Sequence, residues 1–151
     1  MRRRADGKNI WYQLHFPVRL PNSTFVANFD VHSGGRIWYH QFSDSDSIHH
    51  NSSPDDKLFC GDGNKGNPWI LLCRPVLNRN DRTLGENLIK SGKLETEHLV
   101  NLSKTAIHEA HNYRLEPNPM FTPDQKYVIF RSNIFGEDYA FAVETAQPPT
   151  P

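Results

Sequence analysis

Histidine, carboxylate and amide side chains occur at two corresponding places in this 151-residue chain, each before a turn and a strand. His49 precedes the turn Ser53-Pro54-Asp55, and Glu116 and Asn118 precede Thr122-Pro123-Asp124. One imidazole, one carboxylate and one amide oxygen form a mixed set that suits manganese or a similar divalent ion, with waters completing the shell. The spacing therefore predicts a metal site if the fold brings the two places together. The alternative is that His49 only packs against or caps a strand.

Two further patterns resemble functional motifs but lack the required context. Residues 61–66, Gly-Asp-Gly-Asn-Lys-Gly, spell a dinucleotide fingerprint, which must open a helix that holds the phosphates. A strand beginning near Trp69 follows instead, so we predict a turn. His108 and His111 are three residues apart, whereas the zinc-protease motif needs four. Neither nucleotide binding nor a zinc protease is therefore predicted.

The turn that follows the candidate ligands is repeated along the chain. A Pro-Asp turn leads into an apolar strand at residues 53–59 and again at 121–130, with a shorter copy at 6–12. Proline presets φ for such a turn, and aspartate can bond its own backbone. Copies at intervals of several tens of residues indicate a repeat architecture. Because the unit is β, the predicted fold class is an all-β β-propeller with WD40-like blades of about four strands.

The predicted strands fall into about three blades, of which the first and last are incomplete. They lie at residues 10–16, 25–31 and 36–42, then at 58–60, 69–73 and 97–102, and finally between 115 and 144. Residues 79–93 are predicted to be a polar insert, with a short helical stretch around 84–89. Residues 1–145 are thus expected to be C-terminal propeller blades, and 146–151 a disordered Pro-rich tail. Since closing the ring protects sheet edges, we expect upstream blades to be missing.

Composition restricts the partners and the compartment. A net charge of +0 and a pI near 7.1 give no electrostatic footprint for nucleic acid or anionic membrane. The basic start lacks the apolar region of a signal peptide, and no apolar stretch approaches the roughly 18 residues of a membrane span. We therefore expect a cytoplasmic protein. Cys60 and Cys73 are predicted to be buried free thiols.

Several of these segments together are similar to oligogalacturonate lyases, polysaccharide lyase family 22. At the C-terminal end the resemblance lies in residues 113–118 and 121–124, then Phe130-Arg131-Ser132-Asn133 and Phe141-Ala142-Val143-Glu144. Upstream it lies in Trp38-Tyr39-His40, Ser47-Ile48-His49, Ser53-Pro54-Asp55 and Gly61-Asp62-Gly63. The resemblance implies a propeller of roughly seven blades that degrades unsaturated pectin fragments by β-elimination with a divalent metal such as Mn²⁺. The implied partner is an oligogalacturonide.

The resemblance also implies roles for particular residues. A histidine at the place of His49 is a metal ligand in the family. Better-studied members have two histidines where this chain has Glu116 and Asn118, and a glutamine near Tyr113. Glu116 and Asn118 can still coordinate a metal through oxygen. His111 is predicted to be a substitute ligand. Arg114 and Arg131, with Tyr113, are candidates for binding substrate, because a guanidinium pairs bidentately with a carboxylate. The alternative is that Arg114 and Arg131 are solvated residues at the ends of strands and have no role in substrate binding.

The family's catalytic base and substrate-binding arginine lie in an upstream blade that is not found in this chain. The resemblance therefore implies a fragment that holds part of the metal site and no catalytic base. The alternative function is a non-catalytic WD40-like propeller segment that serves as a binding or scaffold module. In either case, open blade edges predict self-association of the isolated chain.

Overall fold

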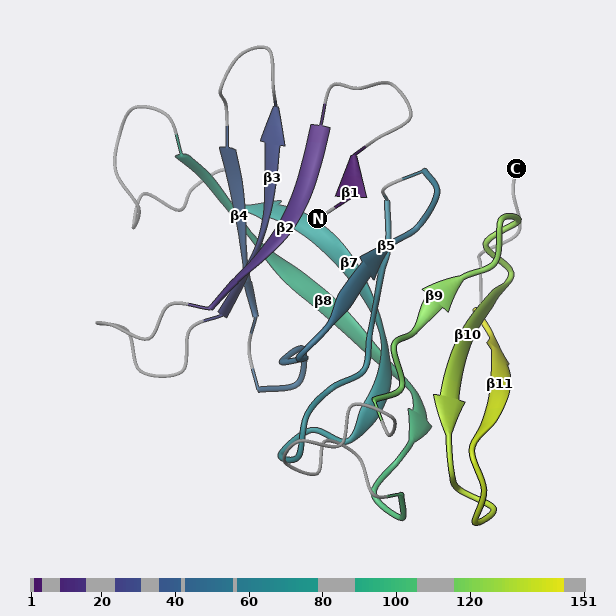
Figure 1. The fold of residues 1–151 in the computed structure, drawn as a ribbon. Helices are drawn as coiled ribbons and strands as arrows, with labels where there is room; N and C mark the ends of the chain where they lie inside the picture. The colour runs from purple at the N-terminus through teal and green to yellow at the C-terminus, as the bar shows by residue number, and fades with distance from the viewer. Residues whose placement is uncertain are drawn as a thin grey trace.

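The computed structural model describes residues 2–3, 9–15, 24–30, 36–41, 43–55, 57–78, 89–105 and 116–145. Every regular element in these ranges is a β-strand. The strands form an eight-stranded sheet in the order β1-β2-β3-β4-β8-β7-β6-β5 and a three-stranded sheet in the order β11-β10-β9 (Figure 1). The described ranges contain no helix of the length and apolarity needed to cross a membrane.

The strand bounds follow the predicted pattern in most places. They are β1 (Arg2–Arg3), β2 (Asn9–His15), β3 (Thr24–Asp30), β4 (Arg36–Gln41), β5 (His50–Ser52), β6 (Phe59–Gly61), β7 (Trp69–Asn78), β8 (Ile89–Asn101), β9 (Met120–Phe121), β10 (Tyr127–Ser132) and β11 (Tyr139–Glu144). The all-β prediction is thus confirmed. The third turn copy at residues 6–8 and the tail at 146–151 lie outside the described residues.

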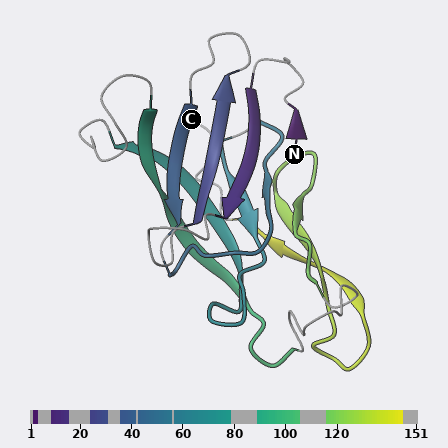
Figure 2. The ribbon, with the colours of Figure 1, turned by 60° about the vertical axis from the view of Figure 1, so that its left-hand side comes forward.

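The two predicted blades that carry the candidate ligands are separate antiparallel units. Strands β5, β6, β7 and β8 pair in sequence order, and so do β9, β10 and β11. In Figure 1 the second unit, coloured green to yellow, lies beside the lower part of the first, and Figure 2 shows the same arrangement from another side. Each candidate ligand precedes the first strand of its unit.

The N-terminal strands are attached in a way that the sequence did not predict. Strand β4 pairs in parallel with β8, so β1 to β4 extend the sheet of the β5–β8 unit instead of forming a blade with its own sheet. The pairing uses the first half of β8, which was expected to be a polar insert. Gly92 of β8 allows its neighbours on both sides to approach closely. A Cβ at this position would lie 2.5 Å from the Val76 carbonyl oxygen and 2.6 Å from the Tyr39 ring. A polar composition therefore concealed a strand whose glycine permits the contact.

Strand β7 is also longer than predicted, because it continues through Pro75. Proline cannot donate to a strand ladder and is confined to edges or bulges. Strand β6 pairs with only three residues of β7, Leu71 to Cys73, so β6 does not reach the proline. On its other side, Pro75 is paired with Leu94 of β8. The short neighbour therefore allows a proline inside a ten-residue strand.

Strand β7 supplies side chains to two apolar clusters, because successive residues point to opposite faces. Leu71 and Cys73 join one cluster, completed by Tyr39, Phe59 and Leu94. Ile70 joins the other, in which Cys60 and Leu102 pack against Val128 and Phe130 of β10. The second cluster lies between the two sheets and fixes the β9–β11 unit against the β5–β8 unit.

Both cysteines are free and buried, as predicted. Burial raises the pKa of each thiol, that of Cys73 to about 12. Since the thiolate is the reactive form, neither side chain is poised for chemistry.

The two Pro-Asp turns are built alike, which confirms that the unit repeats. Ser53 Oγ and Thr122 Oγ1 each donate to the following aspartate, at 2.7 and 2.6 Å. Each also accepts a backbone N–H from five residues ahead, at 3.0 and 3.1 Å. Asp55 and Asp124 in turn accept the backbone N–H two residues on. The same bonds recur at both turns, so the strands after them begin in the same way.

Candidate metal centre

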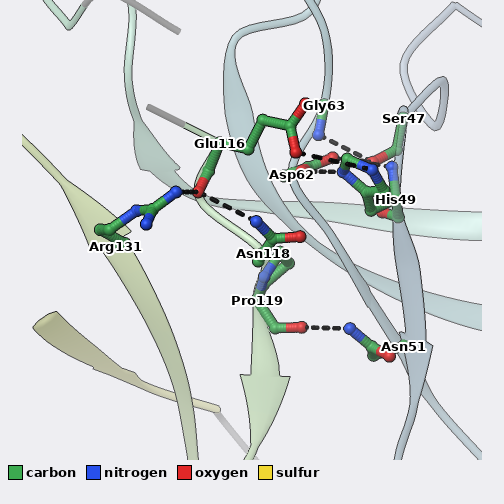
Figure 3. A network of polar contacts seen from close by, with 9 residues as sticks. All are labelled: Ser47, His49, Asn51, Asp62, Gly63, Glu116, Asn118, Pro119 and Arg131. Atoms are coloured by element: carbon green, nitrogen blue, oxygen red, sulfur yellow. Dashed lines mark hydrogen bonds and ion pairs between the residues drawn. The ribbon is translucent and has the colours of Figure 1, made fainter. Parts of the chain in front are cut away.

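The starts of the two units lie together. The Asn51 side-chain amide of β5 donates to the carbonyl of Pro119, directly before β9, at 2.7 Å. This bond and the apolar cluster between the sheets place His49 opposite Glu116, with 4.0 Å between His49 Nε2 and Glu116 Oε2. Figure 3 shows the imidazole reached by carboxylates from both units. The segments that sequence analysis paired are thus adjacent in space.

The other face of the His49 ring is held by a buried carboxylate. Asp62 Oδ2 lies 2.8 Å from His49 Nδ1, and Asp62 Oδ1 accepts the His49 backbone N–H at 2.9 Å. The Asp62 side chain is 0% exposed, whereas that of His49 is 37% exposed. The imidazole therefore has one nitrogen fixed inside the protein, and Nε2 on the side of Glu116.

A buried serine completes this arrangement. Ser47 Oγ accepts the Gly63 backbone N–H at 2.8 Å. Its hydroxyl lies within donor distance of two acceptors, the His49 carbonyl at 2.8 Å and Asp62 Oδ1 at 3.1 Å. Ser45 and Ser47 lie in the loop before His49 and are 0% and 1% exposed. This loop is packed under the site.

The local backbone explains why Asp62 can lie there. Gly63 has φ +63°, and a Cβ at this position would lie 1.9 Å from the Asn67 carbonyl oxygen. Asn64 Oδ1 then closes the turn by accepting the backbone N–H of Gly66 and of Asn67. The Gly-rich segment is therefore the predicted turn, and β7 follows it, so it does not open the helix that a dinucleotide site requires.

On the opposite unit, the segment from Glu116 to Pro119 is held through its backbone. Arg131 Nη2 donates to the Glu116 carbonyl at 2.9 Å, and the Arg131 N–H donates to the Pro117 carbonyl at 2.9 Å. Asn118 has φ 45°, a left-handed conformation that asparagine tolerates better than most residues. Its amide also donates to the Glu116 carbonyl, at 3.2 Å. The Glu116 side chain itself is 20% exposed and faces His49.

The electrostatics of the site favour positive charge at the imidazole. The hydrogen bond with Asp62 raises the pKa of His49 above its ordinary value, and the negative charges of Asp62 and Glu116 raise it further. Partial burial acts in the opposite direction but is outweighed. A site that attracts a proton between two carboxylates also suits a cation.

The donor set is compatible with a small divalent ion. Bonds from such an ion to nitrogen and oxygen are about 2.0–2.2 Å long, so two of its ligands lie at most about 4.4 Å apart. The 4.0 Å between His49 Nε2 and Glu116 Oε2 falls within this range. Within the described ranges, no group of three or more His, Cys, Asp or Glu residues is placed to hold a metal. Further ligands would come from amide or backbone oxygens, waters or other segments.

The remaining predicted site residues have different outcomes. Asn118 lies beside Glu116, exposed at the surface, with its amide nitrogen used by the Glu116 carbonyl. Arg131 contacts the same carbonyl. His111, Tyr113 and Arg114 lie outside the described residues, so their predicted roles stay predictions.

Sequence reasoning missed Asp62 and Ser47. Asp62 was interpreted as part of a turn, and Ser47 was given no role at the site. The available signal was the acid placed between two glycines immediately after a strand, because such a residue can approach a neighbouring segment closely. That signal does not reveal which segment is approached.

The fold and the site define an all-β protein of the β-propeller class, in which consecutive sheets bring polar residues together where their first strands begin. No family model and no curated protein matches the chain. Among solved structures, it is similar to an oligogalacturonate lyase in complex with manganese, with a TM-score of 0.66 and 18% sequence identity. The match covers 94% of this chain and 33% of the solved chain. The chain thus spans about a third of that protein, and the predicted fold class of a partial propeller is confirmed.

Proposed function

We propose that this chain forms part of the metal site of an oligogalacturonate lyase-like propeller, which cleaves short unsaturated pectin fragments by metal-assisted β-elimination. The observation that carries the proposal is the pair formed by His49 Nε2 and Glu116 Oε2, 4.0 Å apart across two blades. The structural relationship with a lyase solved with manganese supports it. We assign Mn²⁺ or a similar divalent ion to this pair.

In the proposed reaction, a base removes the C5 proton of a galacturonate and the C4 oxygen leaves. A divalent ion that grips the adjacent carboxylate withdraws charge and stabilises the enolate-like transition state. His49 and Glu116 would hold that ion, and Asn118 and His111 are proposed as further ligands. Asp62 and Glu116, the two carboxylates that contact the His49 ring, would offset the charge of the ion.

Substrate binding is assigned to Arg114, Arg131 and Tyr113. Arg131 also donates through Nη2 to the Glu116 carbonyl. This bond links one of the proposed substrate-binding residues to the segment that carries the proposed ligand Glu116. We assign the catalytic base to a part of the lyase-like propeller outside this chain, as the resemblance to the lyase family implies. The chain alone is then expected to bind metal and substrate without turnover.

Calorimetry tests the proposal. Mn²⁺ is titrated into the 151-residue chain and into His49→Ala and Glu116→Ala, with the exposed residues of β8 as matched controls, His98→Ala and Glu97→Ala. We expect both site variants to lose affinity and both controls to retain it. Absence of Mn²⁺ binding by the parent chain, or equal binding by all five proteins, would contradict the metal assignment.

A second titration addresses the substrate. Trigalacturonate is added to the Mn²⁺-loaded and metal-free chain, beside its methyl-esterified form, which lacks the carboxylate charge. We expect binding only of the free acid and only with metal. Equal binding of both forms would show that the site does not recognise the galacturonate carboxylate. Cleavage of unsaturated digalacturonate by the chain alone, followed by ultraviolet absorbance, would place a base within it.

A further inference from the structure

We propose that Asp62 is the positioning residue of this site, which keeps the proton of the His49 ring on Nδ1 so that Nε2 is offered to the metal. The inference rests on the proposed function for the identity of the ligand that Nε2 meets. It assigns a role to the Gly61-Asp62-Gly63 motif, which otherwise would only form a turn.

The first observation is that Asp62 holds one residue at two points. Its Oδ2 contacts the His49 ring at Nδ1 and its Oδ1 accepts the His49 backbone N–H, at 2.8 and 2.9 Å. A contact at the ring and another at the backbone of the same residue restrict the orientation of the imidazole. Since a carboxylate only accepts hydrogen bonds when ionised, its partner nitrogen must carry the proton.

The second observation is burial. Asp62 is 0% exposed, so water cannot replace its contact with Nδ1. Nε2 faces the other way, toward Glu116 Oε2. Metal-binding histidines usually donate their second ring N–H to a carboxylate or carbonyl, which fixes the tautomer and orients the ring. Asp62 has the position that this arrangement requires.

The third observation concerns the two glycines. A Cβ at Gly61 would lie 2.8 Å from Ser47 Oγ, and one at Gly63 would lie 1.9 Å from the Asn67 carbonyl oxygen. Any side chain at either position would displace Ser47 or the turn. The glycines therefore allow Asp62 to pack directly behind His49, and Ser47 to reach Asp62 Oδ1 at 3.1 Å.

Other aspartates of the chain show that this is not a general property of its turns. Asp55 and Asp124 follow prolines and accept hydrogen bonds from residues within their own turns. Asp62 instead accepts from Ser47 and His49, which lie on another segment. Asp55→Asn is therefore a matched control for Asp62→Asn.

The substitution Asp62→Asn has a specific expected result. The amide oxygen is required by two donors, the His49 backbone N–H and the Ser47 hydroxyl. The amide nitrogen then faces Nδ1 and donates to it, so the ring proton moves to Nε2. Because a protonated Nε2 cannot bind a metal, Mn²⁺ affinity should fall by roughly 10–100-fold, the usual effect of removing such a partner.

The experiment records ring ¹⁵N resonances of the metal-free 151-residue chain at a pH where the ring is neutral, and Mn²⁺ affinity by calorimetry, for the parent, Asp62→Asn, Asp55→Asn and Ser47→Ala. Expected are an Nδ1–H tautomer in the parent and in Asp55→Asn, an Nε2–H tautomer in Asp62→Asn, and weaker Mn²⁺ binding only when Asp62 or Ser47 is changed. An Nε2–H tautomer in the parent, or an unchanged tautomer in Asp62→Asn, overturns the inference.

The two readouts separate this inference from the proposed function. A parent chain with the Nδ1–H tautomer that does not bind Mn²⁺ would retain Asp62 as the positioning residue and contradict the metal assignment. A chain that binds Mn²⁺ through His49 but has an Nε2–H ring would support the metal assignment and contradict the role of Asp62. If Asp62→Asn does not fold, the tautomer of the parent still decides, and Ser47→Ala tests the support of Asp62.

Discussion

The two sides of the candidate metal centre are held by different groups. On the β5 side a buried carboxylate fixes the histidine side chain itself, whereas on the β9 side Arg131 fixes the backbone carbonyl of Glu116. The potential ligand atom is therefore preorganised on one side, and only its anchor is preorganised on the other. The affinity for an ion should therefore fall more when the histidine side is changed than when the Glu116 side is changed. The His49 side chain is already ordered before binding, whereas the Glu116 side chain must become ordered when the ion binds.

The largest expected effect comes from breaking the support of the histidine side. Gly63→Ala should destabilise the chain by about 3 kcal/mol or more, because the new Cβ meets the Asn67 carbonyl at a positive φ. Gly136→Ala is the control: its φ is also positive, +102°, but a Cβ there meets nothing within 4 Å. We expect a loss of about 1 kcal/mol from the backbone conformation alone. Urea unfolding measures both, and equal losses would mean that the crowded turn is not decisive.

Removal of the histidine ligand should have the next largest effect. His49→Ala is expected to weaken Mn²⁺ binding by about 100-fold, equivalent to about 2.7 kcal/mol. The preorganised nitrogen is lost, and the buried Asp62 loses its partner. Calorimetry gives the affinity, and circular dichroism checks that the variant is folded. A loss of less than about 3-fold would show that His49 is not a ligand.

The carboxylate on the other side should matter less. Glu116→Gln keeps the side-chain length and the Arg131 contact with the backbone, but removes the charge. We expect about a 10-fold loss in Mn²⁺ affinity, or about 1.4 kcal/mol. If Glu116→Gln costs as much as His49→Ala in the same titration, the difference between the two sides disappears.

The smallest effect concerns the pH dependence of stability without metal. Asp62 raises the pKa of His49, so the folded chain binds that proton more tightly than the unfolded chain does. The resulting stabilisation is complete below the unfolded pKa of about 6.5 and is lost as pH rises through the folded pKa. We therefore expect the Tm to fall as the pH rises above the unfolded pKa of about 6.5, and to fall less in His49→Gln. If the Tm of His49→Gln changes with pH in parallel with that of the parent, His49 is not the source of the pH dependence.

The sequence was sufficient to predict the parts of the fold that depend on local pattern. Aromatic and β-branched segments predicted the strands, and the repeated Pro-Asp turns predicted two equivalent units. The same equivalence predicted that His49 and Glu116 occupy matching places, and the structure has them 4.0 Å apart. These features follow from short-range rules of turns and strands.

What could not be predicted depends on contacts between distant segments. The parallel pairing of β4 with β8 has no local signal, and polar residues such as Lys90 and Lys93 lie in its register. Likewise, nothing within the Gly-Asp-Gly turn indicates that its acid contacts His49, because the partner lies on another segment. The predicted ligand and substrate roles of His111, Tyr113 and Arg114 concern residues that the structure does not describe.

The parallel pairing of β4 with β8 also sets an order of assembly. Arg36 of β4 is paired with Ile89 of β8, and the strands between them in sequence, β5 to β7, belong to the sheet that β8 completes. During synthesis β4 therefore emerges before its partner exists, and one of its edges stays unpaired until β8 has been made. Such a contact is slow to form, and an exposed edge can capture another nascent chain. The same strand that extends the sheet in the finished fold makes the early chain vulnerable to misassembly.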